Sequence, residues 1–313
     1  MRNQIRVVNI TILNSIFDTT GRTPIVRLNH IAPKHVEVYA KVEAFNPGDT
    51  IIECTSGNFG IALAVVAAAR GYKFVAVMGD RYSVERRKLI RAYGGKVILF
   101  PSELGSNGGN KIADELAERY GWFRSRQFDN PANPEFHRMT TASEILSDFA
   151  SRRFDYFVTG FGTSGTLTGV GQMLKTVRPD VRIVTTEPAN TAILQDGVWN
   201  IHEIQGLAPN FMPSVMDRTV IDELRKIDDV AARDMSRRLS SEEGIFIGIS
   251  AGATVVTALE VAETASEGSV ILVMMPDTGE RYLSTFFFDN LNEGSDDKWL
   301  AAFESERLLE PAK

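Results

Sequence analysis

The clearest signal of the fold class lies in residues 156–166, which read Tyr156-Phe157-Val158-Thr159-Gly160-Phe161-Gly162-Thr163-Ser164-Gly165-Thr166. It begins like a buried strand and leads into a helix whose apolar positions include Leu167, Val170 and Met173. Glycines and hydroxyl side chains where a strand meets a helix start predict a phosphate-binding loop. The spacing is also Gly-x-Gly-x-x-Gly over 160–165, and Glu187 ends the next strand, as in dinucleotide-binding folds. A tight turn without a ligand is the remaining alternative.

Two further junctions of this kind flank it in the sequence. Thr55-Ser56-Gly57-Asn58-Phe59-Gly60 lies between a strand expected over 50–53 and a helix expected over 58–70. Free N–H groups at a helix start, with small polar side chains, suit a carboxylate or phosphate, although a plain capped helix has the same pattern. Gly248-Ile249-Ser250-Ala251-Gly252-Ala253 is weaker. Ser250 as an N-cap and Gly252 as a close helix contact would explain it without a ligand.

Around these junctions, short β-branched runs alternate with helix-period segments, which predicts an α/β fold with a mainly parallel sheet. The remaining expected strands are 36–42, 74–78, 96–100, 156–159, 182–186 and 269–275, and the remaining helices are 83–93, 110–120, 134–150, 165–176, 230–239 and 251–265. A domain change is expected near 130–150, and a polar link over 292–298 leads to a final helix. The basic residues of 83–93, Arg86, Arg87, Lys88 and Arg91, are expected to form a solvated face.

Composition narrows the class of partner. The chain has 313 residues, enough for about two domains, and its 34 basic and 40 acidic residues give a net charge of -6. No basic surface argues for nucleic acid or a membrane, so a small molecule is the expected partner. The single cysteine, Cys54, reads as a buried core thiol, and the four histidines form no zinc-like spacing, so no metal is expected. No apolar stretch reaches about 18 residues, and a cytoplasmic protein is expected.

Several separated strings resemble the cysteine synthase (O-acetylserine sulfhydrylase) family of fold type II, tryptophan-synthase-β-like pyridoxal-phosphate enzymes. They are Gly21–Pro24, Lys41–Glu43, Asn46–Gly48, Thr55–Gly60, Ser83–Arg87, Gln127–Pro134, Glu187-Pro188, Gln205-Gly206 and Pro276-Asp277-Thr278-Gly279-Glu280-Arg281-Tyr282-Leu283-Ser284. The resemblance implies two three-layer α/β domains with the cofactor site between them, a smaller one over 44–130 and a larger one over 1–43 plus 131–313. It also implies pyridoxal 5′-phosphate (PLP), a homodimer and β-replacement on an O-activated serine, as when O-acetylserine and sulfide, or a related nucleophile, react.

The resemblance also implies residue roles. The cofactor phosphate would be held by Gly162, Thr163, Ser164, Gly165 and Thr166. Ser250 would face the pyridine nitrogen, where a neutral hydroxyl favours β-elimination over transamination, and Asn58 would contact the ring 3′ oxygen. Thr55, Ser56 and Gln127 would bind the substrate carboxylate, and Gly57 would keep the approach open. Phe59, where the family commonly has Thr, leaves the substrate undecided, and Ser164 and Ala251 also depart from the family pattern.

The serious departure lies at Asn46-Pro47-Gly48-Asp49-Thr50. In the family, Asn-Pro-Gly is followed by Gly-Ser-Val-Lys-Asp-Arg, whose lysine forms the Schiff base, and by a helix. Here that segment is absent between Gly48 and Asp49, so no catalytic residue is assigned. Lys41 is the nearest lysine, but it shares the polar face of its strand with Tyr39. Losing the helix would leave part of the smaller domain's sheet uncovered.

Two explanations of the missing lysine stay open. Either the numbering runs across a segment that the working protein contains, or the protein lacks the lysine. Three functions stay open as well. They are PLP-dependent β-replacement, a lysine-less homologue that binds PLP or an amino acid with impaired catalysis, and an NAD(P)-dependent oxidoreductase that uses Gly160-x-Gly162-x-x-Gly165.

Overall fold

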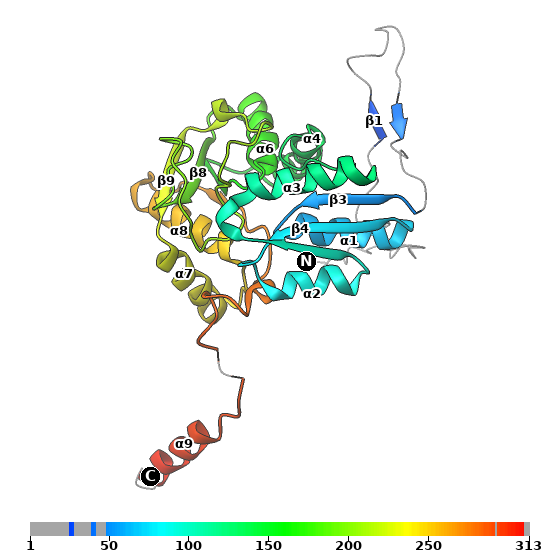
Figure 1. The fold of residues 1–313 in the computed structure, drawn as a ribbon. Helices are drawn as coiled ribbons and strands as arrows, with labels where there is room; N and C mark the ends of the chain where they lie inside the picture. The colour runs from blue at the N-terminus through cyan, green and yellow to red at the C-terminus, as the bar shows by residue number, and fades with distance from the viewer. Residues whose placement is uncertain (1–24, 28–38, 42–47, 292, 310–313) are drawn as a thin grey trace, which may run out of the picture.

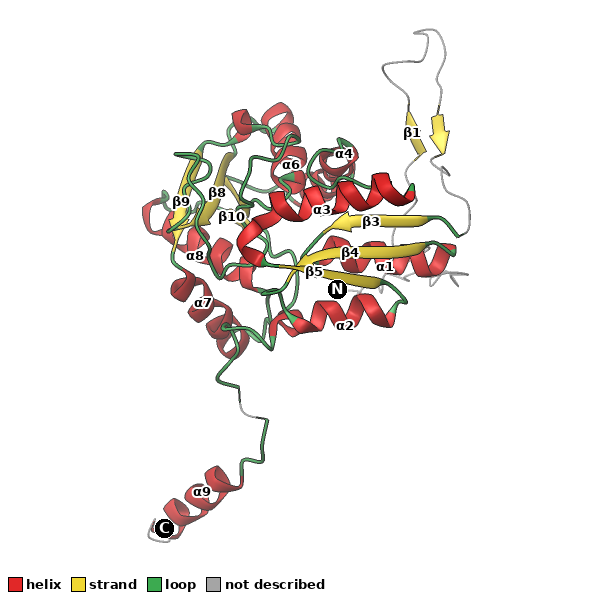
Figure 2. Cartoon of the chain, viewed as in Figure 1, coloured by secondary structure: helices red, strands yellow, loops and turns green. Residues whose placement is uncertain are grey.

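The computed structural model describes residues 25–27, 39–41, 48–291 and 293–309, and in this part of the chain two four-stranded parallel sheets form the body (Figures 1 and 2). The first has the order β5-β4-β3-β6 and the second β10-β7-β8-β9. The strands of the first are β3 (Thr50–Cys54), β4 (Lys73–Gly79), β5 (Lys96–Phe100) and β6 (Phe123–Arg124). Those of the second are β7 (Tyr156–Gly160), β8 (Arg182–Pro188), β9 (Glu223–Ile227) and β10 (Ile271–Val273). The predicted α/β class is confirmed, whereas the domain limits at 44–130 and 131–313 stay a prediction.

Helices cover both faces of the first sheet. They are α1 (Asn58–Arg70), α2 (Val84–Ala92) and α3 (Gly105–Tyr120), with a short 3₁₀ turn at Ser102–Leu104. Successive strand residues point to opposite faces, so Ile51 packs with α1 and α2 while Ile52 packs with α3. Gly109 of α3 lies so close to the sheet that a Cβ there would come within 2.6 Å of the Cys54 sulfur. Helix α3 begins at Gly105 rather than at the predicted Asn110, because its first turns contain Gly108 and Gly109, whose low helix propensity hides the start in the sequence.

The second sheet carries the larger core. Its helices are α4 (Ala132–Met139), α5 (Thr141–Asp148), α6 (Gly165–Val177), α7 (Asp229–Glu242) and α8 (Ile249–Thr264), with 3₁₀ turns at Arg218–Val220 and Gly279–Tyr282. Phe157 of β7 packs in the core that contains α6, and its neighbour Val158 packs under α8. The helix predicted over 134–150 is two helices, because the backbone breaks at Thr140.

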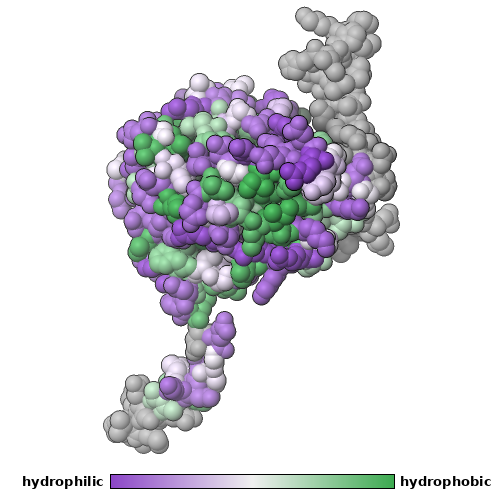
Figure 3. Space-filling model, in the orientation of Figure 1, coloured by the Kyte–Doolittle hydropathy of each residue, from purple (hydrophilic) through white to green (hydrophobic). Residues whose placement is uncertain are grey.

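Helix α1 is apolar on every side. All residues from Phe59 to Ala69 are apolar or glycine, yet Phe59 is 37% and Val66 36% exposed. A helix that is apolar all round is normally covered all round, yet this side of α1 is open among the described residues. In Figure 3 further apolar side chains gather over the strands of the first sheet on the face turned to the viewer.

Two segments lie apart from the body in Figure 1. Strands β1 (Ile25–Arg27) and β2 (Tyr39–Lys41) pair antiparallel in a sheet of their own, so the strand predicted over 36–42 is not a neighbour of β3. The rest of that predicted strand lies outside the described residues. Helix α9 (Asp297–Leu309) is the predicted final helix. Over the described residues, no helix combines the length and apolarity needed to cross a membrane, and no group of His, Cys, Asp and Glu could hold a metal ion.

Candidate active site

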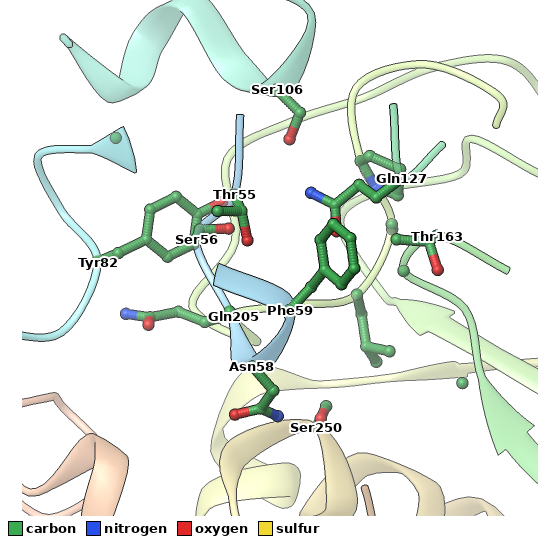
Figure 4. Close-up of a pocket in the computed structure, with 18 of the residues that line it drawn as sticks. Thr55, Ser56, Asn58, Phe59, Tyr82, Ser106, Gln127, Thr163, Gln205 and Ser250 are labelled. Carbon is green, nitrogen blue, oxygen red and sulfur yellow. The ribbon is translucent and has the colours of Figure 1, made fainter. Parts of the chain in front are cut away.

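A cavity of about 350 Å³ lies where the carboxyl ends of β3 and β7 meet (Figure 4). It is lined by every residue to which the sequence assigned a binding role, namely Thr55, Ser56, Gly57, Asn58, Gln127, Gly162, Thr163, Ser164, Gly165, Thr166 and Ser250. Loops at the carboxyl ends of parallel strands are where α/β folds place ligands. The structure therefore brings residues from both sheets into one pocket.

The loop at the end of β3 is rigid at its start and open at its middle. The Thr55 hydroxyl accepts a hydrogen bond from the Gly60 N–H at 3.1 Å, and the Thr55 N–H donates to the Val77 carbonyl at 3.0 Å. Gly57 is the N-cap of α1, and a Cβ added there would meet nothing within 4 Å. Free N–H groups of the first helical turn are thus accessible to an anion such as a carboxylate.

Gln127 reaches this loop from the segment after β6. Its Nε2 donates to the Cys54 carbonyl at 2.6 Å. The preceding residues are held by Glu53, whose carboxylate accepts hydrogen bonds from Arg124 Nη1 at 2.8 Å and from the Arg126 N–H at 2.7 Å. Burial raises the pKa of Glu53, outweighing the opposite effect of Arg124. The buried carboxylate therefore fixes where Gln127 enters the pocket.

The loop at the end of β7 is closely packed. A Cβ on Gly162 would collide with the Gly206 carbonyl, and one on Gly165 would collide with the Asn133 side chain. Ser164 adopts a left-handed conformation with φ 71° as the N-cap of α6, and its buried hydroxyl has no hydrogen-bond partner among the described residues. A helix start with a spare hydroxyl and no room for larger residues fits a phosphate group.

Asn133 ties the Gln127 segment to the β7 loop, a role that the sequence interpretation missed. Its Nδ2 donates to the Gln127 carbonyl at 3.0 Å and to the Thr163 hydroxyl at 2.9 Å. The available signal was its place within the string Gln127–Pro134. Beside it, the Thr166 hydroxyl lies 3.3 Å from His137 Nε2, and burial lowers the pKa of His137, so the imidazole favours its neutral form.

Asn58 and Ser250 lie at the same end of the pocket in Figure 4. Asn58 Nδ2 donates to Asp277 Oδ2 at 2.8 Å, while its buried Oδ1 has no partner in the described part of the chain. Ser250 is the second residue of α8, and the N-cap is Gly248, so the N-cap explanation of Ser250 is wrong. The packing explanation of Gly252 holds, because a Cβ there would collide with Ala232 and Ser236 of α7.

None of the described lysine side chains lines the pocket, and its basic lining residues are Arg81, Arg86 and His202. Gly48 and Asp49 follow one another in a sequence of 313 residues, and the turn there is bonded on both sides. The Gly48 N–H donates to the Gly71 carbonyl and the Lys73 N–H to the Asp49 carbonyl, both at 2.8 Å. The turn therefore joins Gly48 directly to Asp49 in the sequence as given, and both explanations of the missing lysine stay predictions. The side chain of Lys41 lies outside the described residues.

Two other side chains of the lining, Cys54 and Tyr82, favour their neutral, protonated forms. Cys54 is buried, as predicted, and burial raises the pKa of its thiol to about 12, so a thiolate nucleophile is disfavoured. Tyr82, which the sequence interpretation missed, forms a hydrogen bond with Ser56, but burial has the larger effect and raises the pKa of its phenol. Its hydroxyl thus stays a neutral hydrogen-bonding group beside the β3 loop.

Glu187 does not serve the pocket as a dinucleotide fold would require. Its side chain is fully buried, one carboxylate oxygen accepts a hydrogen bond from the Leu194 N–H at 3.0 Å, and it is not part of the lining. The Gly-x-Gly-x-x-Gly loop therefore lacks the acid that would bind a ribose, and the oxidoreductase alternative loses its support.

Comparison with known proteins agrees with this geometry. The family model described as pyridoxal-phosphate dependent enzyme matches residues 46–277. O-ureido-L-serine synthase of Streptomyces lavendulae is 67% identical over 318 residues, covering 94% of this chain and 98% of that protein. Cysteine synthase of Staphylococcus aureus is 39% identical over 305 residues, covering 89% and 98%. The 318 aligned positions outnumber the 313 residues of this chain, so part of the first relative has no counterpart here, in line with the shortening at Gly48.

Solved structures give the same picture. A lysine-to-alanine mutant of O-ureido-L-serine synthase with O-ureido-L-serine bound is 66% identical, has a TM-score of 0.85 and covers 94% of this chain and 99% of that one. O-acetylserine sulfhydrylase isoform 3 of Entamoeba histolytica is 32% identical, with a TM-score of 0.76, covering 96% and 99%.

Proposed function

Because the chain belongs to the family of pyridoxal-phosphate dependent enzymes, we propose that its pocket binds PLP with an O-activated serine and is built for β-replacement. The observation that carries the proposal is the convergence of a phosphate-type helix start and a carboxylate-type helix start on one cavity. Bound PLP supplies an electron sink for chemistry at the substrate Cα.

The chain's own residues divide the work of binding. The Gly162–Thr166 loop would hold the phosphate, because its glycines let the backbone close on it and the Ser164 hydroxyl is free. Ser250 would face the ring nitrogen as a neutral hydroxyl, and Asn58 would contact the ring oxygen. Thr55, Ser56 and Gln127 would orient the substrate carboxylate, a proposal that rests on their common position around the start of α1.

For the product, the higher identity to O-ureido-L-serine synthase than to cysteine synthase favours a serine whose β-oxygen carries a ureido group. A ureido group offers N–H donors and a carbonyl acceptor, so it needs polar partners. The lining supplies hydroxyl groups for them at Ser106 and Tyr82, which Figure 4 draws together with Phe59. We therefore place an O-ureido-L-serine type of product before cysteine. The homodimer and the cytoplasmic location stay predictions.

The pocket's lack of a described lysine favours a second candidate, a homologue that binds PLP and the amino acid but turns over slowly. The relative that carries alanine in place of a lysine has O-ureido-L-serine bound, so in that protein binding does not need this lysine. The two candidates share the binding site and differ in the rate of turnover.

Spectroscopic titration followed by a turnover assay tests the proposal. PLP is added to the purified chain, and we expect a saturable change in its visible absorbance, a further change with O-acetyl-L-serine, and none with a nicotinamide dinucleotide. Product formed with N-hydroxyurea or sulfide is then measured by mass spectrometry. Product supports the first candidate, binding without product supports the second, and the absence of saturable PLP binding contradicts both.

A further inference from the structure

The start of α2 is fastened to the segment 277–284 on the other side of the pocket. The Ser284 N–H and hydroxyl donate to the two carboxylate oxygens of Glu85 at 2.9 and 2.7 Å. The next residue, Arg86, donates from Nη1 to Gln205 Oε1 at 2.9 Å. Two successive residues of α2 therefore contact segments that belong to the other side of the pocket.

Arg86 contradicts the expected solvated face of α2, because its side chain is only 2% exposed. Its guanidinium carbon lies 4.1 Å from the centre of the Tyr282 ring, and Nη2 lies 3.8 Å from Asp277 Oδ2. A buried cation needs a partner that compensates for lost hydration, and here a carboxylate and an aromatic face supply it. This buried charge pair lines the cofactor pocket.

Asp277 connects Arg86 and Tyr282 to Asn58, the residue proposed to contact the cofactor ring. Its Oδ2 accepts hydrogen bonds from Asn58 Nδ2 at 2.8 Å and from the Tyr282 hydroxyl at 2.6 Å. Its carboxylate lies against Gly248, the N-cap of α8, where a Cβ would collide with it. Through Asn58 and the start of α8, one carboxylate contacts the elements that carry both side chains proposed to face the cofactor ring.

We infer that Asp277 is a positioning residue that orients the Asn58 amide toward the cofactor ring, and that Arg86 holds Asp277 in place from the other domain. The inference rests on the proposed assignment of Asn58 to the ring oxygen. An ionised carboxylate only accepts hydrogen bonds, so it selects the NH₂ side of the Asn58 amide and rejects the carbonyl side. The amide has two N–H donors, and the one that Asp277 does not use remains for the ring oxygen.

The substitution Asp277→Asn tests this with almost no change of shape. An amide at 277 both donates and accepts, so it no longer selects one orientation of Asn58. In D277N we expect PLP binding to weaken about tenfold, as for the loss of one well-formed hydrogen bond, and the absorption maximum of bound PLP to shift. Glu85→Gln is the matched control, because Glu85 bonds to Ser284 of the same segment 277–284 but does not contact Asn58. E85Q should leave the PLP affinity and the absorption maximum unchanged.

A double-mutant cycle separates positioning from a general effect on the fold. If Asp277 acts through Asn58, D277N should add less than about twofold to the loss of PLP affinity already caused by Asn58→Ala. The melting temperature of each variant without PLP is recorded alongside. If D277N fails to fold, Arg86→Gln replaces it in the test, because this substitution keeps the carboxylate and removes its cation. We expect R86Q to lower PLP affinity less than tenfold, and we expect no such effect of R86Q in the N58A background.

The outcomes are distinct. Tenfold weaker binding with a shifted absorption maximum, lost in the N58A background, supports the inference. Two results overturn the inference and leave the proposed function standing, provided that the wild-type protein binds PLP. In the first, D277N binds PLP as E85Q does. In the second, D277N keeps its full effect in the N58A background. Wild-type protein that binds no PLP overturns the proposed function and this inference with it.

Discussion

The two loops that form the pocket share one design but differ in how tightly they are built. Both follow the carboxyl end of a parallel strand and open a helix. In the β7 loop, Gly162 and Gly165 leave no room for a Cβ. In the β3 loop Gly60 is packed in the same way against Thr55, but Gly57 in the middle has nothing within 4 Å of that position. A closely packed loop suits a cofactor that stays bound, and an open one suits a substrate that exchanges. The segment that would carry the family's lysine is absent shortly before this open loop, between Gly48 and Asp49.

Restoring that segment should have the largest effect. Grafting the corresponding residues of O-ureido-L-serine synthase between Gly48 and Asp49 supplies a group able to move a proton at the substrate Cα, and such groups contribute about 10²–10⁴-fold. We expect at least a hundredfold gain in turnover, measured by mass spectrometry of the product. The same graft with its lysine replaced by alanine is the control. Equal rates in the two grafts would show that the lysine does not limit this chain.

The same small change in the two loops should separate their roles. Gly162→Ala drives a methyl group into the Gly206 carbonyl, so G162A should lower PLP affinity more than about tenfold, with a loss of stability of about 1–3 kcal/mol from the clash. The methyl group of Gly57→Ala meets no atom, so G57A should leave PLP affinity unchanged. It should lower the affinity for the amino acid about threefold, because the methyl group narrows the proposed carboxylate site. Titrations with PLP and then O-acetyl-L-serine measure both. Equal effects on PLP would erase the distinction between the loops.

The thiol behind the open loop gives a pH prediction. Burial raises the folded-state pKa of Cys54 to about 12, above the ordinary value of about 8.5. As pH rises above the ordinary value, the unfolded chain releases a proton that the folded chain keeps, so the free energy of unfolding falls. Urea unfolding between pH 8 and about 10 should show this decline, and Cys54→Ala should flatten it. A higher rate of Cys54 alkylation in the native protein than in the unfolded chain would contradict this burial.

The uncovered side of α1 should give the smallest effect. Val66→Lys replaces an exposed apolar side chain, so the free energy of unfolding should change by less than about 0.5 kcal/mol, while the solubility of the chain rises. Ala64→Lys on the same helix is the contrasting variant, because Ala64 is fully buried and the charge would unfold the domain. Thermal melting and light scattering of the two variants measure this. A large loss of stability in V66K would mean that something covers this side.

The fold class and the loops that line the cavity could be predicted from sequence because both depend on local signals. Runs such as Phe74–Met78 are strands by composition, and the helix over Asn58–Arg70 was predicted at its observed limits. The loops at Thr55 and Gly162 were recognisable as candidates because glycine and hydroxyl residues gather where a strand meets a helix start, although a capped helix has the same pattern at Thr55. The resemblance added the roles within the pocket, and the comparisons bear out the family and the cofactor.

What could not be predicted depends on contacts between distant residues. Arg86 looks like any surface arginine until Asp277 and Tyr282 are placed beside it. Strand β9 has the mixed sequence Glu223-Leu224-Arg225-Lys226-Ile227 of a partly exposed edge, so no apolar run marks it. Asn133 lies in a string that resembles the family, but nothing in the neighbouring sequence indicates that it bonds to both Gln127 and Thr163.

That bridge through Asn133 has a thermodynamic consequence. One amide nitrogen holds both the backbone beside the proposed carboxylate site and a hydroxyl of the proposed phosphate site. Any free energy by which an occupied phosphate loop favours the carboxylate must, by reciprocity, favour the phosphate equally when the carboxylate is bound. Saturation with amino acid would then slow the dissociation of PLP from a pocket that no described lysine lines.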